Sequence, residues 1–263
     1  MVNEEASAAM SDTPKIYPKI YIVGAGPGDP ELLTVRAERL IKTADVVLYA
    51  DSLIPPGIVA LTRADCERIP TKNLTLETIV PLMIERVRAG KLVLRLHSGD
   101  VSLYGAIYEQ IQALHGAGIG VEIIPGVGAM QLAAARLTTE WTVPELVQTV
   151  ILTRTAGITP MPENLADLAA HRATLGLYLS ARLVDQAQAE LQKHYPPDTL
   201  VAVCHRLGWP QERIWLVPLT QMAAVTHREH LTRTTLYVIS PVFGAGVTRS
   251  QLYHPQHRHL FRP

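Results

Sequence analysis

The chain carries Gly24-Ala25-Gly26-Pro27-Gly28-Asp29-Pro30 directly after the apolar run Ile20-Tyr21-Ile22-Val23. An apolar strand, a glycine-rich turn and a helix in this order are typical of an α/β protein. The dinucleotide-binding pattern G-x-G-x-x-G would need its third glycine where the chain has Asp29, and Gly28 comes one place early. Asp29 suits the N-cap of a helix and Pro30 its first position. The stretch therefore predicts a ligand-facing turn in an α/β protein that is not built for NAD.

Two further turns that contain glycine also follow apolar runs. Gly99-Asp100-Val101-Ser102-Leu103-Tyr104-Gly105 comes after Leu92-Val93-Leu94 and a short polar stretch. Pro125-Gly126-Val127-Gly128-Ala129-Met130 comes directly after Val121-Glu122-Ile123-Ile124. Ligand pockets favour the carboxyl ends of parallel strands and the junctions between domains. These turns are therefore the first candidates for a binding site.

Apolar runs and turn residues alternate along the chain and divide it into two parts. The first part predicts strands near 18–23, 44–49, 66–69, 91–97 and 120–124, and helices near 30–42, 55–61, 75–89 and 103–116. This alternation is typical of a mainly parallel sheet covered on both faces. The second part predicts helices over 128–137, 163–170 and 183–193, and strands near 148–154, 173–179, 199–205, 212–217 and 234–239. Its last strands have little helix between them, which favours a mixed α+β domain.

We therefore expect an α/β protein with two domains, a mainly parallel-sheet N-terminal domain over 15–126 and a mixed α+β C-terminal domain over 127–243. Residues 1–14 are expected to form a disordered leader, and residues 244–263 an irregular tail rich in His and Arg. The boundary places the turn at 125–130 at the junction between the domains, where binding sites are common.

The bulk composition excludes some classes of partner. The 263 residues include 24 Lys and Arg against 24 Asp and Glu, so the formal net charge is zero, which argues against binding nucleic acid mainly through its phosphates. Cys66 and Cys204 are expected to be small core residues in a reducing compartment. The chain shows neither a signal peptide nor an apolar stretch near the ~20 residues that span a bilayer. We expect a cytoplasmic protein that binds neither nucleic acid nor membranes.

Taken together, the motifs G-A-G-P-G-D-P, G-D-x-S-L-Y-G-A and I-P-G-V-G resemble those of the tetrapyrrole methylases. Further strings resemble the branch of that family that methylates carbon 11 of precorrin-4, namely Tyr49–Pro55, Arg95–His97, Gln148–Arg154, Gly208–Pro210, Ser250–Tyr253 and His259–Arg262. The resemblance covers roughly residues 19–262. It implies a two-domain fold, S-adenosylmethionine (SAM) as the cofactor, a tetrapyrrole substrate and a homodimer.

The cofactor site is expected around the three turns. SAM carries no phosphate, so its site needs close approach of the backbone, a carboxylate and apolar surface. Gly99 permits the first, and Asp100 can accept hydrogen bonds from an amine or a hydroxyl. The resemblance implies the cofactor residues Pro27, Gly99, Asp100, Leu103, Gly105, Gly128, Ala129, Tyr178, Leu179 and Arg206. Taken singly, each of these residues would be interpreted as a turn or core residue, and only the ordered set favours a site.

A precorrin is a polyanionic macrocycle, so its cleft should offer cationic side chains. Candidate substrate-binding residues are Lys72, His97, Arg154 and Arg182, although a solvated or ion-paired surface role suits each of them equally. Asp51 resembles the position of an acceptor Asp in the related uroporphyrinogen methylases and is the candidate general base, with a capping role as the alternative. We expect no metal site, because the spacing of His254, His257 and His259 matches no standard motif.

Several alternatives remain open at this point. Another member of the superfamily could methylate a different precorrin or uroporphyrinogen carbon, or act on a diphthamide precursor or ribosomal RNA. The strings at 49–55 and 148–154 and the zero net charge count against the last two. A NAD-dependent oxidoreductase lacks its third glycine. A non-catalytic tetrapyrrole-binding protein would bind the macrocycle without SAM, and the intact Gly99-Asp100 turn argues against it.

Overall fold

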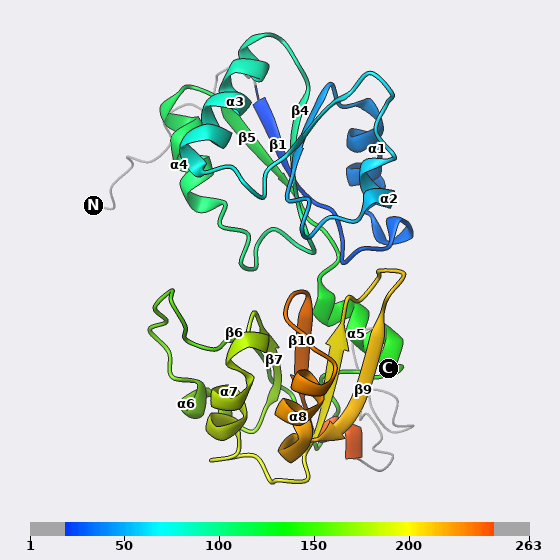
Figure 1. Cartoon of the computed structure of the whole chain (residues 1–263), viewed down its shortest axis with the longest axis vertical. Helices are drawn as coiled ribbons and strands as arrows, with labels where there is room; N and C mark the ends of the chain where they lie inside the picture. Colours follow the sequence, from blue (N-terminus) through cyan, green and yellow to red (C-terminus); the bar gives the residue numbers. More distant parts are fainter. Residues whose placement is uncertain (1–18, 245–263) are drawn as a thin grey trace, which may run out of the picture.

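Two five-stranded sheets form the core of the computed structural model, which describes residues 19–244. Figure 1 shows one sheet above the other, each with its own helices. The expected leader over 1–14 and nearly all of the expected tail over 244–263 lie outside the described residues. Within the described part, no helix is both long enough and apolar enough to span a bilayer.

The first sheet is entirely parallel, with the strand order β3-β2-β4-β1-β5. Its strands are β1 (Lys19–Gly24), β2 (Val46–Tyr49), β3 (Glu67–Pro70), β4 (Val93–His97) and β5 (Gly120–Ile124). The helices α1 (Val35–Thr43) and α2 (Pro56–Val59) cover one face, and α3 (Leu76–Arg88) and α4 (Tyr108–Gly116) cover the other (Figure 1). The predicted parallel sheet with both faces covered is confirmed.

Alternate residues of β4 point to opposite faces of this sheet, as expected for a strand. Leu94 and Leu96 pack with α1 and α2, whereas Val93 packs with α3 and α4. Arg95 and His97 therefore lie on the same face as Val93, beneath α3 and α4. Both side chains are buried.

The second sheet is mixed, with the strand order β6-β7-β10-β8-β9. Its strands are β6 (Val150–Arg154), β7 (Thr174–Tyr178), β8 (Leu200–His205), β9 (Arg213–Pro218) and β10 (Thr235–Ile239). β6 and β7 are parallel, and the other pairs are antiparallel. One face packs against α6 (Leu165–Ala169), α7 (Val184–Leu191) and α8 (Met222–Arg228), and the other packs against α5 (Ala129–Leu137). The predicted mixed character of this part is also confirmed.

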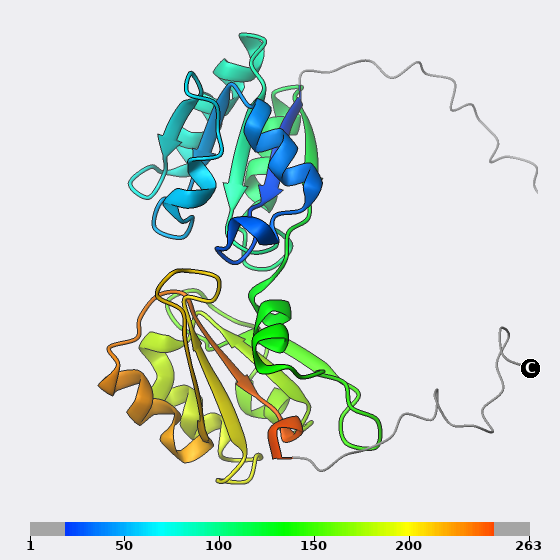
Figure 2. The same cartoon turned by 90° about the vertical axis from the view of Figure 1, so that its right-hand side faces the viewer.

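The chain passes from the first half to the second once within the described residues, between β5 and α5. Figure 2 shows this connection leading into α5, which packs on the second sheet. The predicted domain boundary after residue 126 falls in this connection and stays a prediction.

Three details differ from the expected helices. The helix expected over 103–116 begins only at Tyr108, because Tyr104 and Ala106 have left-handed φ angles of 55° and 47° that an α-helix excludes. The helix α8 was not expected; it is seven residues long and buries Met222 and Val225 against the sheet. The helix expected over 30–42 is divided into a 3-10 turn, Pro30–Leu32, and α1.

The predicted capping role of Asp29 is confirmed for the 3-10 turn. Its Oδ1 accepts a hydrogen bond of 3.0 Å from the backbone N–H of Glu31, and Pro30 occupies the first position. Thr34 then caps α1 by accepting from the N–H of Ala37. The chain therefore leaves the first glycine turn in a fixed direction.

Candidate functional site

The three glycine turns pack directly against one another at the carboxyl edge of the first sheet. We name them the first turn (24–29), the second turn (99–105) and the third turn (125–128). Gly26 and Gly99 exchange backbone hydrogen bonds of 3.2 and 2.7 Å. A Cβ atom added to Gly24 would lie 2.6 Å from the nitrogen of Gly126, and one added to Gly126 would overlap the carbonyl oxygen of Gly99. These glycines are therefore required because backbone meets backbone, and not because a phosphate approaches them.

Asp100 ties the second turn to the third. Its Oδ2 accepts a hydrogen bond of 2.9 Å from the N–H of Gly126, and its Oδ1 accepts from the N–H and the hydroxyl of Ser102. Partial burial raises the pKa of Asp100, but these hydrogen bonds outweigh it and hold the pKa below its ordinary value. The site therefore contains an ionised carboxylate in a fixed orientation.

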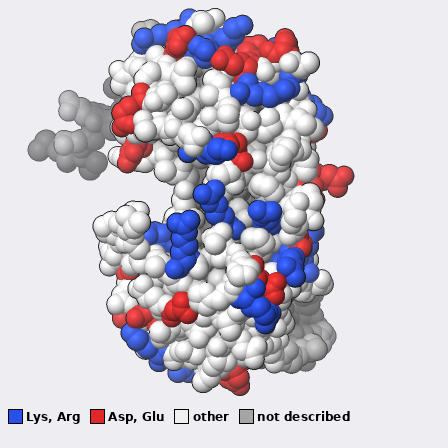
Figure 3. Space-filling view, viewed as in Figure 1, with Lys and Arg blue, Asp and Glu red and all other residues white. Residues whose placement is uncertain are grey.

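A cavity of about 360 Å³, here called the central cavity, lies between the two halves. Figure 3 shows the hollow between the halves, with Lys and Arg side chains on its lower margin. The first half contributes Pro27, Leu53, Ser98, Gly99, Asp100, Leu103 and Tyr104. The second half contributes Gly128, Ala129, Tyr178, Leu179, Ala181, Arg182, Cys204, Leu207 and the segment 232–236. An apolar cavity with a few fixed polar groups is typical of a small-molecule site.

Eight of the ten predicted cofactor residues line this cavity: Pro27, Gly99, Asp100, Leu103, Gly128, Ala129, Tyr178 and Leu179. Gly105 and Arg206 do not. Gly105 closes the loop of the second turn, where a Cβ atom would collide with the backbone of Val101. The guanidinium of Arg206 lies 5.7 Å from the ring centroid of Trp209. A cofactor-binding role stays a prediction for all ten residues.

Sequence reasoning missed part of the lining, including Leu53, Ser98, Tyr104, Ala181, Leu207 and the segment 232–236. Leu53 and Tyr104 lie inside quoted motifs and Ser98 and Leu207 lie beside them, whereas Ala181 and the segment 232–236 carry no motif. The backbone gives a signal that the sequence does not, because Tyr104, Leu179 and Thr234 all have left-handed φ angles. Strained backbone of this kind tends to gather at functional sites. Tyr104 also stacks on Tyr178, with ring centroids 5.6 Å apart.

Among the predicted substrate-binding residues, only Arg182 lines the central cavity, where it is joined by Arg233. No carboxylate pairs with either guanidinium within residues 19–244. Arg154 instead donates to the carbonyl oxygens of Thr159 and Pro160, at 3.1 and 2.7 Å, and so holds the loop that follows β6. It lines a separate hollow of about 350 Å³.

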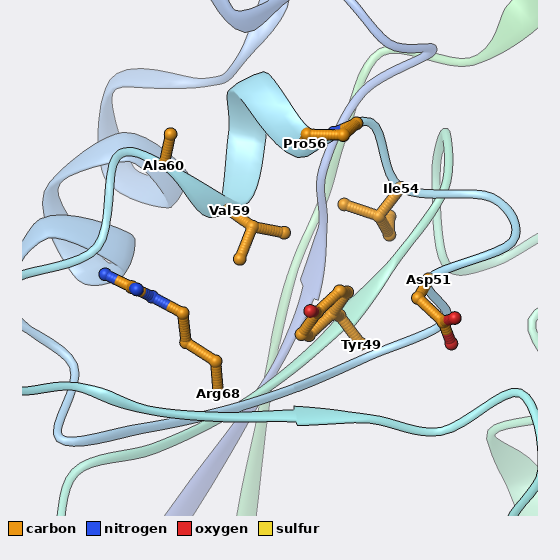
Figure 4. A pocket seen from close by; sticks show the side chains of 7 residues that line it. All are labelled: Tyr49, Asp51, Ile54, Pro56, Val59, Ala60 and Arg68. Atoms are coloured by element: carbon orange, nitrogen blue, oxygen red, sulfur yellow. The ribbon is translucent and has the colours of Figure 1, made fainter.

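Asp51 and Lys72 form a pair with each other. The Lys72 ammonium lies 3.0 Å from Asp51 Oδ2, and the Lys72 N–H donates to Oδ1 at 3.1 Å. Desolvation raises the pKa of Asp51, but the hydrogen bonds from Lys72 outweigh it and lower the pKa below its ordinary value. In this state Asp51 is a weak base. Figure 4 shows it at one end of a hollow of about 330 Å³ that ends at Arg68 and is distinct from the central cavity.

His97 does not line the central cavity. Its ring is buried next to Arg95, which donates to the Thr71 hydroxyl at 2.9 Å. Among the described residues, neither His97 Nε2 nor Arg95 Nε has a hydrogen-bond partner. Burial, with the repulsion of Arg95, lowers the pKa of His97 to about 3, and burial lowers the pKa of Arg95 to about 10. His97 is therefore neutral in the folded protein near pH 7.

Metal ligands are not grouped in the described part of the chain, where no three His, Cys, Asp or Glu side chains gather closely enough to hold an ion. The three histidines of the expected tail, His254, His257 and His259, lie outside the described residues.

Comparison with known proteins relates the cavity and the fold to one family. A family model described as tetrapyrrole (corrin/porphyrin) methylases matches residues 19–223. A precorrin-4 C(11)-methyltransferase from Pseudomonas aeruginosa is 45% identical over 247 residues, which cover 93% of this chain and 98% of the relative. The X-ray structure of a cobalt precorrin-4 methyltransferase, a cobalamin biosynthetic enzyme, superposes with a TM-score of 0.82 at 40% identity and covers 85% of this chain and 95% of its own.

A uroporphyrin-III C-methyltransferase from Thermus thermophilus, solved as a complex with S-adenosylhomocysteine, superposes with a TM-score of 0.72 at 28% identity. It covers 86% of this chain and 99% of its own. The family model matches most of the described sequence, and the identity to the Pseudomonas relative extends over nearly its full length. Both findings lead to the same conclusion. The chain belongs to the tetrapyrrole methylase family.

Proposed function

We propose that this protein is a SAM-dependent methyltransferase that methylates carbon 11 of precorrin-4 or cobalt-precorrin-4 in cobalamin biosynthesis. The observation that carries the proposal is the central cavity, which brings together eight cofactor residues expected from three separate turns and from β7. The printed names of the Pseudomonas relative and of the superposed X-ray structure support the same substrate class.

The chemistry of the lining fits SAM. The cavity offers one fixed carboxylate, Asp100, and threonine hydroxyls in the segment 232–235, while Leu103, Leu207 and Leu236 supply apolar surface. Bound SAM would supply an electrophilic methyl group. Asp100 would accept a hydrogen bond from the amine or a hydroxyl of the cofactor. Gly99 and Gly128 have no side chains, so the cofactor could approach the backbone there.

Binding of the tetrapyrrole that accepts the methyl group requires cationic side chains rather than a protein nucleophile. Arg182 and Arg233 can pair with the acetate and propionate groups of a precorrin and so hold its macrocycle against the cavity. The macrocycle carbon is itself electron-rich, so the protein contributes mainly proximity and alignment. We retain Asp51 as the candidate base. Because the Asp51 carboxylate is paired with Lys72, we propose that substrate binding first separates the two side chains.

The first test is a methyl-transfer assay with purified protein, SAM and a panel of precorrin and cobalt-precorrin intermediates. We expect precorrin-4 or cobalt-precorrin-4 to gain the mass of one methyl group, located at carbon 11 by NMR. Transfer only to a different intermediate would contradict the carbon-11 assignment and keep the methyltransferase. Absence of both transfer and S-adenosylhomocysteine binding would contradict the enzyme and favour a tetrapyrrole-binding protein.

Replacing Asp100 with alanine is expected to weaken S-adenosylhomocysteine binding by about 10- to 100-fold, the range for losing hydrogen bonds to a charged group. Isothermal titration calorimetry measures the dissociation constant directly. Asp65→Ala is the matched control, because Asp65 is an exposed acid that does not line the cavity. Equal affinities of wild type and Asp100→Ala would contradict the role of this carboxylate.

Three finer expectations are also proposals. We propose a homodimer, as the family resemblance implies, a cytoplasmic location, and domains that divide after residue 126. Light scattering coupled to size exclusion measures the mass in solution, and a mass of about one chain would contradict the dimer. Limited proteolysis that cuts between β5 and α5 would support the division.

A further inference from the structure

The loop between β8 and β9, residues 206–212, reaches from the second half to the first turn. A Cβ atom added to Gly28 would lie 2.6 Å from Cδ1 and 2.9 Å from Nε1 of Trp209. A Cβ atom added to Gly208 would lie 2.9 Å from the nitrogen of Asp29. The indole ring and the loop backbone therefore rest on the first turn with no room for a side chain at either glycine.

The second half holds this loop firmly. Glu212 accepts a hydrogen bond of 2.6 Å from the N–H of Gly208 and one of 2.8 Å from Arg136, which lies on α5. The N–H of Trp209 donates to the carbonyl of Arg206 at 2.9 Å, and the Arg206 guanidinium lies 5.7 Å from the ring centroid. Trp209 is thus presented to the first turn by a loop that is braced on its own side.

The contact lies directly next to the wall of the central cavity in the sequence. Pro27 and Leu207, the residues immediately before Gly28 and Gly208, both line the central cavity. Gly28, Gly208 and Trp209 themselves line a second hollow of about 710 Å³. The position of Pro27 relative to Leu207 is therefore set by the contact next to them.

We infer that Trp209 is a positioning residue, whose docking on Gly28 fixes the spacing of the two halves at the cofactor cavity. Gly28, the glycine that comes one place early for a dinucleotide site, is favoured both by its φ of 151° and by the indole ring that rests on it. The inference rests on the proposed function, since it takes the central cavity as the cofactor site.

A double-mutant cycle tests the contact through the dissociation constant for S-adenosylhomocysteine. We expect Gly28→Ala and Trp209→Ala each to weaken binding by about tenfold, and the double variant by clearly less than about a hundredfold. The strain of a side chain at a φ of 151° is present in both variants that carry Gly28→Ala, so it does not contribute to the coupling. Two changes that break one contact are not additive, and coupling of this size is ordinary for residues in contact. A double variant weakened about a hundredfold would overturn the inference, because the two residues would then act separately.

Trp215 on β9 provides the matched control cycle. Its ring packs against the core cluster that the second sheet forms with α6, α7 and α8, and not on the first turn. The effects of Gly28→Ala and Trp215→Ala on binding should add. Coupling as strong as that of Gly28 with Trp209 would indicate a general loss of structure and would overturn the inference. Thermal unfolding of every variant, monitored by circular dichroism, distinguishes a variant that binds more weakly from one that is not folded.

A second measurement decides the matter if Gly28→Ala does not fold. Trp209→Phe keeps an aromatic ring on Gly28, so we expect it to bind S-adenosylhomocysteine within about twofold of wild type, whereas Trp209→Ala loses about tenfold. Equal affinities of these two variants would overturn the inference. Failure of the wild type to bind S-adenosylhomocysteine would count against the proposed function itself, which distinguishes the two failures.

Discussion

Replacing Gly126 with alanine is expected to lower the free energy of unfolding by about 3 kcal/mol, the upper range for overpacking a tight contact. A Cβ atom at this position would overlap the carbonyl oxygen of Gly99 and would lie 2.8 Å from the carbonyl carbon of Gly24. Both neighbours are backbone atoms, Gly24 at the end of β1 and Gly99 in a turn held by two hydrogen bonds to Gly26, so neither can rotate away. Urea denaturation measures the effect as a lower midpoint at an unchanged slope.

Gly116→Ala is the matched control for this prediction. Gly116 is the exposed last residue of α4, and a Cβ atom there would meet nothing within 4 Å. The same substitution should therefore be neutral or stabilising by up to about 1 kcal/mol, because alanine restricts the unfolded chain more than glycine does. If Gly126→Ala unfolded at the same urea concentration as the wild type, the close packing of the three turns would be wrong.

The second large effect concerns pH. The pKa of His97 falls from 6.5 to about 3 on folding, chiefly through burial and also through the charge of Arg95. Below pH 6.5 the unfolded chain binds a proton at His97 that the folded protein refuses. Its contribution to stability is therefore complete above pH 6.5 and is lost as the pH falls to about 3. The loss is about 1.4 kcal/mol per pH unit, or on the order of 4–5 kcal/mol over the whole window.

His97→Gln isolates this contribution, because glutamine has a similar shape and does not titrate. We expect the difference in unfolding free energy between wild type and His97→Gln to change by several kcal/mol between pH 7 and pH 4, with the variant less sensitive to acid. His115→Gln, an exposed histidine on α4, controls for the removal of an imidazole. Parallel curves for wild type and His97→Gln would show that the buried ring accepts its proton in the folded state.

The strands were predictable from the sequence because burial on both faces leaves long apolar runs between turn residues. Ile20, Ile22 and Val23 of β1, for example, are completely buried. The start of α4 was not predictable, because the left-handed backbone at Tyr104 and Ala106 is imposed by the loop around the second turn. The helix α8 is too short to show a clear period, and it depends on tertiary packing against the second sheet.

The cavity lining was predictable mainly where the glycine turns lie, and in addition at Tyr178 and Leu179 at the end of β7. The first, second and third turns carry motifs, and Asp100 and Gly128 line the cavity as expected. The segment 232–236 carries no motif, because threonine and leucine at the start of a strand are ordinary residues there. A contact between residues far apart in sequence, such as that of Gly28 with the indole ring of Trp209, leaves only an unexplained glycine in the sequence.

Over residues 19–244 the chain crosses only once from the first half to the second, which has a consequence for biosynthesis. All strands of the first sheet lie within residues 19–124, and all strands of the second lie within 150–239. Neither sheet therefore contains a strand from the other half of the chain. The first half can therefore fold on the ribosome while the second is still being translated. The central cavity, by contrast, needs residues up to Leu236. A nascent chain that stalls before this point would already hold a finished sheet but no complete cavity.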